Sequence, residues 1–199
     1  MSRMTDFTVP STVPGRTLHA FCCEPEGEVR AVLQLSHGMV EYIDRYRPLA
    51  EYLADRGILV TGHDHLGHGA SIRTKEDYGY FAEPDGNRAV LADLHAVTVL
   101  TKELYPNLPY FLLGHSMGSF YARQYLCEYG RELDGAIIMG TGFQSKALVK
   151  VAKTLCRVLA AFHGWHYRSS FVANLSFMGY NKGLEGRTTH DLSLIHISE

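Results

Sequence analysis

Short apolar runs alternate with amphipathic stretches along most of this sequence of 199 residues. A strand buried in a parallel sheet is apolar on both faces, and four runs have this character: 31–36, 58–60, 110–113 and 136–139. Between them, apolar residues recur at helical spacing in three segments: 46–56, 87–105 and 119–129. Residues 7–10 and 17–23 flank the turn residues Pro14-Gly15 and predict an antiparallel pair of strands. The alternation predicts an α/β protein with a mostly parallel, doubly wound sheet.

A further helix is expected over residues 146–162. Its apolar side chains fall on one helical face: Leu148, Val151, Leu155, Val158, Leu159 and Phe162. Its positive charges fall on the opposite side: Lys150, Lys153 and Arg157. A core helix and a surface helix both show this pattern, so periodicity leaves the place of this helix in the fold open.

Composition and charge narrow the classes of function. With 46% apolar and 20% charged residues, the chain can bury a full core and is expected to form one domain or slightly less. A net charge of −2 without a long basic run argues against a nucleic-acid partner. The N-terminus has no apolar stretch like that of a signal peptide, and no apolar run approaches the roughly 20 residues of a membrane span. We therefore expect a cytoplasmic protein.

The cysteines have no metal-binding or redox spacing. Cys22 and Cys23 are adjacent, so in a strand they point to opposite faces, and Cys127 and Cys156 stand alone. The pattern predicts buried free thiols rather than a disulfide framework or a zinc site.

Gly114-His115-Ser116-Met117-Gly118 has the G-x-S-x-G pattern and stands between an expected strand and an expected helix. In a nucleophile elbow, a strained strand-to-helix turn presents a serine hydroxyl at the helix N-terminus, and the flanking glycines allow close packing around it. The alternative is a glycine-rich turn with an incidental serine. The flanking strand and helix favour the elbow.

His37-Gly38-Met39-Val40 follows the strand at 31–36 directly. In this architecture the loop supplies one N–H of the oxyanion hole, and the residue after the nucleophile, Met117, supplies the other. Two fixed donors stabilise the charge that forms on an attacked carbonyl oxygen by a few kcal/mol. An ordinary turn would also explain His37-Gly38 taken alone.

Residues 62–71, Gly-His-Asp-His-Leu-Gly-His-Gly-Ala-Ser, invite two other interpretations. Three histidines and a carboxylate within six residues suggest a metal site, and Gly62 with Gly67 imitates a phosphate-binding loop. His68 replaces the lysine that a phosphate loop needs, and no further ligand completes a metal sphere. We expect a structural loop held by side-chain hydrogen bonds.

These motifs together resemble the monoacylglycerol lipase and lysophospholipase branch of the α/β-hydrolases, also known as serine aminopeptidase S33-like or hydrolase-4 proteins. The resemblance rests on the following residues: Gly114 to Ser119, His37-Gly38 with Glu41, Arg45 and Tyr46, Asp64-His65-x-Gly67-His68-Gly69-x-Ser71, Tyr105-Pro106 and Gly179 to Lys182. It extends from near the N-terminus to about Asp191. One departure is Tyr42, which stands where many relatives have a histidine.

The resemblance implies Ser116 as nucleophile and the backbone amides of Met39 and Met117 as oxyanion donors. Other residues would support the elbow and the loop: Gly114, His115, Gly118, His37 and Gly38. It implies no cofactor and no metal, and an acyl ester as substrate. Residues 1–142 would form the N-terminal part of the α/β-hydrolase core, and residues 143–191 the beginning of a helical cap that shapes an acyl-chain pocket or touches a membrane surface transiently.

The partners that activate such a serine are missing from the sequence. In this fold an Asp or Glu and then a His follow the serine, each after a later strand. Four histidines follow Ser116, and none comes after a further strand and helix: His163, His166, His190 and His196. The His115 side chain should point away from the serine, since neighbours on a strand face opposite ways. We expect the acid and the base of the triad to lie outside this chain.

Residues 192–199, Leu-Ser-Leu-Ile-His-Ile-Ser-Glu, match what a common sequencing adapter encodes when it is read in frame. We therefore interpret the chain as a gene fragment that ends near Asp191, followed by adapter read-through. A natural C-terminal strand is the alternative, because the segment also alternates as a strand does.

The expected function of the full-length parent is hydrolysis of monoacylglycerol or lysophospholipid esters through an acyl-enzyme, with the fragment itself inactive. Two alternatives remain open. The same motifs serve carboxylesterases and serine aminopeptidases, and the fold also hosts non-catalytic ligand-binding proteins.

Overall fold

The computed structural model describes residues 2–172 and divides the chain into two compact units, residues 1–143 and 144–199. Three sequence motifs lie outside the described residues: 179–182, His190 and the proposed adapter segment 192–199. The first unit contains the sheet and the candidate site, and the second contains the helix α4 (Lys146–His163).

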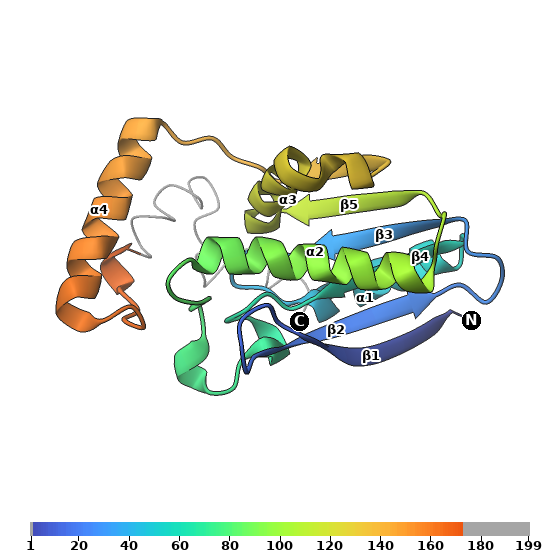
Figure 1. Cartoon of the computed structure of the whole chain (residues 1–199), viewed down its shortest axis with the longest axis horizontal. Coiled ribbons are helices and arrows are strands. Elements are labelled where there is room, and N and C mark those ends of the chain that lie inside the picture. The colour runs from blue at the N-terminus through green and yellow to red at the C-terminus, as the bar shows by residue number, and fades with distance from the viewer. Residues whose placement is uncertain (1, 173–199) are drawn as a thin grey trace, which may run out of the picture. The chain divides into compact units, whose positions relative to one another are not determined.

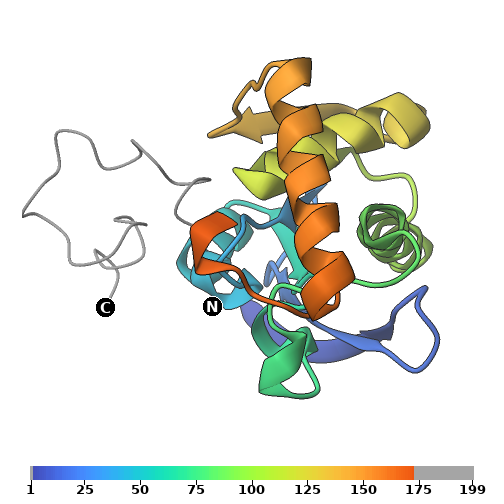
Figure 2. The same cartoon turned by 90° about the vertical axis from the view of Figure 1, so that its left-hand side faces the viewer.

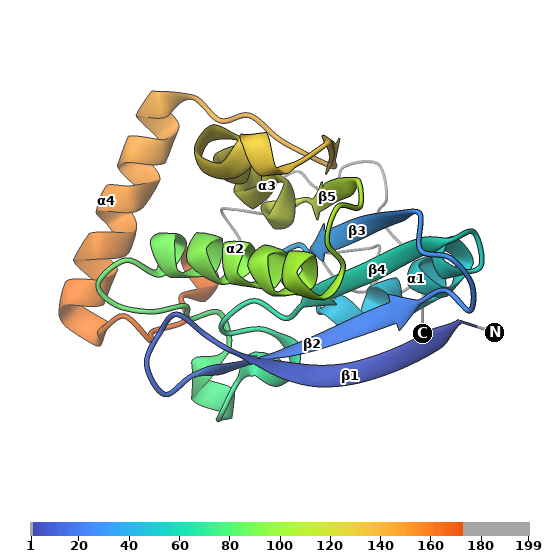
Figure 3. The ribbon, with the colours of Figure 1, turned by 45° about the vertical axis from the view of Figure 1, so that its right-hand side comes forward.

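Six strands form one sheet in the order β1-β2-β4-β3-β5-β6. Their bounds are Arg3–Pro10 (β1), Thr17–Glu24 (β2), Ala31–Ser36 (β3), Ile58–His63 (β4), Tyr110–His115 (β5) and Gly135–Met139 (β6). The four strands from β3 to β6 run parallel, and β1 and β2 join them as an antiparallel ribbon (Figure 3). The prediction of a mostly parallel sheet with an antiparallel start is confirmed.

The first strand is longer than the sequence pattern predicts. It begins at Arg3 rather than Phe7, and Arg3 pairs with Glu24 in the register of the ribbon. Residues 3–6 are mostly polar because this edge strand buries little of its surface, so hydrophobicity alone does not reveal it. β4 also extends past Val60 to His63, because the segment that follows it is buried despite its polar side chains.

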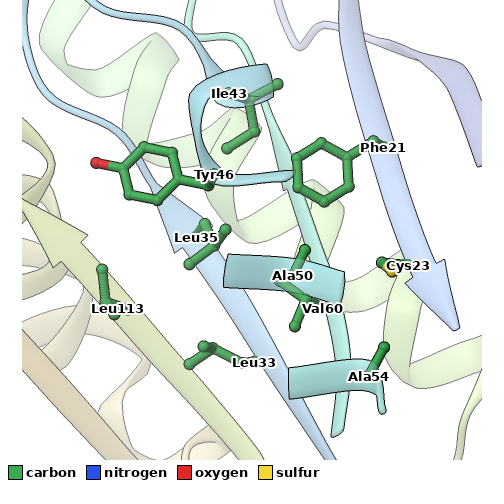
Figure 4. Close-up of a cluster of buried hydrophobic side chains, with 10 residues drawn as sticks. All are labelled: Phe21, Cys23, Leu33, Leu35, Ile43, Tyr46, Ala50, Ala54, Val60 and Leu113. Atoms are coloured by element: carbon green, nitrogen blue, oxygen red, sulfur yellow. The ribbon is translucent and has the colours of Figure 1, made fainter. Parts of the chain in front are cut away.

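The helices of the first unit cover both faces of the sheet (Figure 1). α1 (Arg47–Ala54) packs on one face, where Ala50 and Ala54 meet Leu33, Leu35 and Val60 (Figure 4). α2 (Gly86–Leu104) and α3 (Met117–Tyr129) pack on the other face, against side chains that alternate with the first set along the strands, as Leu112 does. The fold is therefore a three-layer α/β/α arrangement, as the alternation of apolar runs predicts.

The chain reverses its direction of winding at β3. The connection through α1 leads to β4 on one side of β3, whereas the connection through α2 leads to β5 on the other side. Ligand sites of open α/β sheets form outside the carboxyl ends of strands at such a switch point. His37-Gly38 follows β3 and Ser116 follows β5, so both motifs lie at this position.

α4 spans 18 residues. Figure 2 shows it as one continuous helix. The side chain of Ser145 caps its N-terminus by accepting a hydrogen bond from the Leu148 N–H. Most of its large apolar side chains are exposed, including Val151 and Phe162. In the part of the chain that the structure describes, no helix is both long enough and apolar enough to cross a bilayer.

All four cysteines are free thiols, but the prediction that they are buried is wrong for two of them. Cys23 is buried and Cys22 is half-buried, on opposite faces of β2. Cys127 is exposed because it lies on the side of α3 opposite its buried residues, and Cys156 is exposed on α4, which buries none of its residues. Helical periodicity shows which residues share a face of a helix, but whether that face is buried depends on what packs against it.

Candidate active site

Ser116 lies at a sharp turn between β5 and α3. Its φ of +52° and ψ of −114° are rare for a residue with a side chain and cost strain energy, which is commonly found at functional sites. The backbone is held on both sides of the turn, since the Ser116 N–H donates to Met139 O (3.0 Å) and the Ser116 carbonyl accepts from Ser119 N–H (3.0 Å) and Oγ (2.5 Å). The Ser116 hydroxyl, by contrast, has no hydrogen-bond partner among the described residues.

The two motif glycines allow α3 to pack directly on the strand ends. A Cβ on Gly118 would overlap the Ser36 carbonyl oxygen and lie 2.7 Å from His37 O, both of which are backbone atoms. A Cβ on Gly114 would lie 2.7 Å from the Ala122 Cβ and overlap the Gly118 carbonyl oxygen. Larger residues would therefore push the helix away from the sheet and move the turn that holds Ser116.

The loop after β3 lies against the serine. A Cβ on Gly38 would lie 3.1 Å from the Ser116 Cβ, so only a glycine leaves room at this approach. Among the described residues, the N–H of Met39 has no acceptor, and the N–H of Met117 belongs to the first turn of α3, where helix N–H groups have no partner within the helix. The structure thus brings together Ser116 and two amides without acceptors, on adjacent segments.

His37 holds the peptide that carries the Met39 amide. Its Nδ1–H donates to the Gly38 carbonyl oxygen (2.7 Å), while its Nε2 accepts from the His65 N–H (3.0 Å). These two contacts require a neutral ring with the proton on Nδ1. Burial lowers the pKa of His37 to about 3, so the ring stays neutral at physiological pH.

Glu41 is a buried carboxylate that sequence reasoning noted only as part of the family pattern. It accepts hydrogen bonds from the Gly38 N–H, Tyr46 Oη (3.0 Å), Arg45 Nη1 (3.1 Å) and His115 Nδ1 (2.8 Å). Burial raises its pKa, but the donors of His115, Gly38 and Tyr46 together outweigh burial and hold the pKa below its usual value. Glu41 is therefore an anion in the folded protein.

Residues 62–71 form a buried loop beneath this site. The Asp64 carboxylate accepts from the Ile43 N–H (2.7 Å) and the Ala70 N–H (2.8 Å), and the Ser71 hydroxyl donates to the Asp64 carbonyl (2.7 Å). The prediction that side-chain hydrogen bonds hold this loop is confirmed. The three histidines of the segment are buried, and neither ring nitrogen of His63 has a partner within the described part of the chain.

One group of side chains in residues 2–172 has donor atoms close enough to hold a metal ion. Asp6, His19 and Asp44 offer one atom each within 4.8 Å of one another. Arg47 pairs with both carboxylates, so a cation already compensates their charge. The histidines of residues 62–71 are not members of this group and belong to no such cluster among the described residues.

The ring nitrogens of His37 and His115, the histidines near Ser116, form hydrogen bonds with other groups. The ring of His115 donates to Glu41, and both nitrogens of His37 are occupied. His163 and His166 belong to the second unit. The described residues therefore contain an elbow and two donor amides, but no histidine bonded to the Ser116 hydroxyl.

A strained serine between β5 and α3, at the switch point of a mostly parallel sheet, defines an α/β-hydrolase fold. The profile of the family described as serine aminopeptidase S33, or hydrolase-4, matches residues 27–189, and the chain belongs to this family. The fold and family expected from the motifs are thereby confirmed.

Individual proteins are similar to this chain in sequence or in structure. Monoglyceride lipase of Homo sapiens is 37% identical over an alignment of 120 residues, which covers 55% of this chain and 35% of the relative. Monoacylglycerol lipase of Mycolicibacterium smegmatis is 31% identical over an alignment of 139 residues, which covers 66% of this chain and 46% of the relative. Among solved structures, a highly thermostable carboxyl esterase from Bacillus coagulans in complex with glycerol superposes with a TM-score of 0.82 at 26% identity, over 98% of this chain and 62% of that chain. The matched region spans between a third and a half of the length of the two lipases.

Proposed function

We propose that the protein to which this chain belongs is a serine hydrolase that cleaves monoacylglycerol or lysophospholipid esters, with Ser116 as its nucleophile. The observation that carries the proposal is the strained turn at Ser116, against which Gly38 packs so closely that a Cβ would lie 3.1 Å from the serine Cβ. We assign the amides of Met39, next to Gly38, and Met117, next to Ser116, as the two oxyanion donors. Backbone amides in this arrangement are the usual oxyanion donors of the fold.

The chemistry follows from these groups. The Ser116 oxygen bonds to the carbonyl carbon of the ester as its proton passes to a base, and the carbonyl oxygen becomes an oxyanion held by the two amides. When the tetrahedral intermediate collapses, the bond from the acyl carbon to the glycerol oxygen breaks, and glycerol or the glycerophosphodiester part of the lysophospholipid leaves as an alcohol with a proton from the base. Water then attacks the acyl-enzyme in the same way and releases the fatty acid. No cofactor takes part in these steps.

The base and its acidic partner are proposed to come from a later part of the protein. The Ser116 hydroxyl has no histidine partner among the described residues, and the family order places the acid and the histidine after later strands. We therefore expect the 199-residue chain to be inactive or nearly so. The two lipases, which extend well beyond the matched region, fit this proposal.

We assign residues 143–191 to the beginning of a cap. α4 supports this role because it exposes apolar side chains such as Val151 and Phe162 while Lys150 and Lys153 carry positive charge. An amphipathic basic helix of this kind can cover an acyl-chain pocket or lie transiently on a lipid surface.

The test uses the protein continued from its source gene to the length of its relatives. Intact protein should react with a fluorophosphonate probe and hydrolyse medium-chain esters, and Ser116→Ala should abolish both. Thr8→Ala is a control, because Thr8 is an exposed hydroxyl residue on the edge strand β1, outside the elbow and the proposed cap. Equal turnover by Ser116→Ala and the intact protein would refute the proposal, and absence of any probe reaction would favour a non-catalytic ligand-binding protein.

A general carboxylesterase is the second candidate, favoured by the superposition on the Bacillus coagulans esterase. A panel of esters with acyl chains from two to eighteen carbons, with a peptide amide added, separates the candidates. A lipase prefers long acyl chains on glycerol, an esterase prefers short chains, and an aminopeptidase cleaves the amide.

A further inference from the structure

The loop between β3 and α1 is strained. Val40 has a φ of +60°, which is rare for any residue with a side chain and rarer still for a β-branched one. Such a conformation persists only where surrounding contacts over-determine it. The next residue, Glu41, holds this loop in place, because its carboxylate is buried, with 4% of the side chain exposed, and accepts the Gly38 N–H.

One oxygen of this carboxylate joins two segments of the site. Oε1 accepts the Gly38 N–H, which is one residue before Met39, and the His115 Nδ1–H, which is one residue before Ser116. Glu41 in the loop and His115 in the elbow are 74 residues apart in the sequence. The same oxygen atom therefore bonds to both of them, in addition to the strand pairing that places Ser36 beside Gly114.

We propose that Glu41 is a positioning residue that sets the separation of the two oxyanion-hole amides, those of Met39 and Met117. This inference rests on the proposed function and deepens it. On the loop side Glu41 accepts the Gly38 N–H, in the peptide before the one that carries the Met39 N–H, and on the elbow side it holds the imidazole ring of His115, the residue before Ser116. His37 completes the arrangement by holding the Gly38 carbonyl, so that the Met39 N–H, on the opposite edge of the same peptide, stays free.

The charge of Glu41 does not act on the oxyanion directly. A bare carboxylate beside a developing oxyanion would oppose catalysis, but here four donors surround the group, among them Arg45, which contacts Oε2 (3.1 Å). Its effect is geometric, because charge-assisted hydrogen bonds are roughly twice as strong as neutral ones and hold their donors more firmly.

The four contacts provide a matched control. Tyr46 donates to the same Oε1 (3.0 Å) from the short 3-10 helix Ile43–Tyr46 just before α1, outside the His37-Gly38-Met39-Val40 segment and the elbow. Tyr46→Phe removes one buried hydrogen bond from Glu41 and leaves the Gly38 and His115 contacts intact. Glu41→Gln keeps the shape of the side chain but removes its charge and turns an amide donor toward Arg45 or toward Gly38.

The first experiment measures kcat and KM for a short-chain ester in the protein continued to the length of its relatives, with active sites counted by fluorophosphonate titration. Glu41→Gln should lower kcat by 10- to 100-fold while KM stays within about twofold, because misplaced donors weaken only transition-state contacts. Tyr46→Phe should leave kcat within about twofold. A Glu41→Gln kcat within twofold of the intact protein, or a loss equal to that of Tyr46→Phe, overturns the inference.

Ser116→Ala in the same protein separates the two claims. If that variant retains full turnover, the proposed function fails whatever Glu41 does. If it is inactive while Glu41→Gln has normal kcat, only the positioning role fails. Because Gln is isosteric with Glu, this test does not depend on a variant that leaves a cavity.

A second measurement uses the 199-residue chain and needs no turnover. In ¹H–¹⁵N spectra, Glu41→Gln should shift the amide signals of Gly38 on the loop and Met117 on the elbow, whereas Tyr46→Phe should shift Met117 much less. A Met117 signal that Glu41→Gln leaves in place would show that the carboxylate does not connect the two segments, and would overturn the inference.

Discussion

Acidification should destabilise this protein because histidine rings at the ends of β3 and β4 are buried in their neutral form. Burial lowers the pKa of His37 to about 3 and that of His63 to about 4, against about 6.5 in an unfolded chain. Between those values the unfolded state binds more protons than the folded state. Stability is therefore present above pH 6.5 and falls as the pH falls through this window.

The magnitude follows from proton linkage. At pH 5, a group with an unfolded pKa of about 6.5 and a folded pKa at or below about 4 lowers the free energy of unfolding by about 2 kcal/mol. His37 and His63 together account for about 4 kcal/mol between pH 7 and pH 5, a large part of the roughly 5–15 kcal/mol that stabilises a typical domain. Burial also holds the pKa of His65 well below its usual value, which adds to the loss.

Substitution of His63 tests the titration of one buried ring without breaking a hydrogen bond, because neither of its ring nitrogens has a hydrogen-bond partner among the described residues. His63→Leu replaces it with an apolar side chain, and His63→Gln with a polar one, so the two variants differ in stability at pH 7 but share the absence of a titrating group. Urea unfolding at pH 7 and pH 5 should show that both variants lose about 2 kcal/mol less than the intact chain on acidification. An equal loss in all three proteins would refute the reasoning and mean that the His63 ring is hydrated in the folded state.

Two further predictions concern packing and the buried loop. Gly118→Ala should lower the free energy of unfolding by about 3 kcal/mol in urea, because the new methyl group overlaps the Ser36 backbone. It should also slow any reaction at the neighbouring serine. Gly130→Ala is the control: its Cβ meets nothing closer than 3.7 Å, so the free energy of unfolding should change by less than about 0.5 kcal/mol in the same experiment. Asp64→Ala should leave the buried Ile43 amide and the partly buried Ala70 amide without an acceptor and cost about 3 kcal/mol. Hydrogen exchange at the Ile43 amide should accelerate, and unchanged exchange there would contradict the hydrogen bond assigned to Asp64.

The sequence by itself determined the order and type of most elements, because two kinds of periodicity are visible in it. Apolar runs such as 110–113 need burial on both faces and predicted parallel strands, while the helical spacing of Val90, Leu91 and Leu94 predicted α2. The G-x-S-x-G pattern marked the turn at Ser116, because flanking glycines are required where a helix packs on a strand end. These features depend on near neighbours along the chain.

Only the tertiary structure decided which distant groups meet. Nothing in the spacing of Glu41 and His115 shows that one carboxylate oxygen bonds the loop and the elbow, because that contact depends on β3 and β5 lying side by side in the sheet. The polar start of β1 and the exposure of Cys127 were likewise invisible, since both depend on what packs against an element rather than on its own residues. Local physics selects helices, strands and turns, whereas burial and hydrogen-bond partners are properties of the assembled chain.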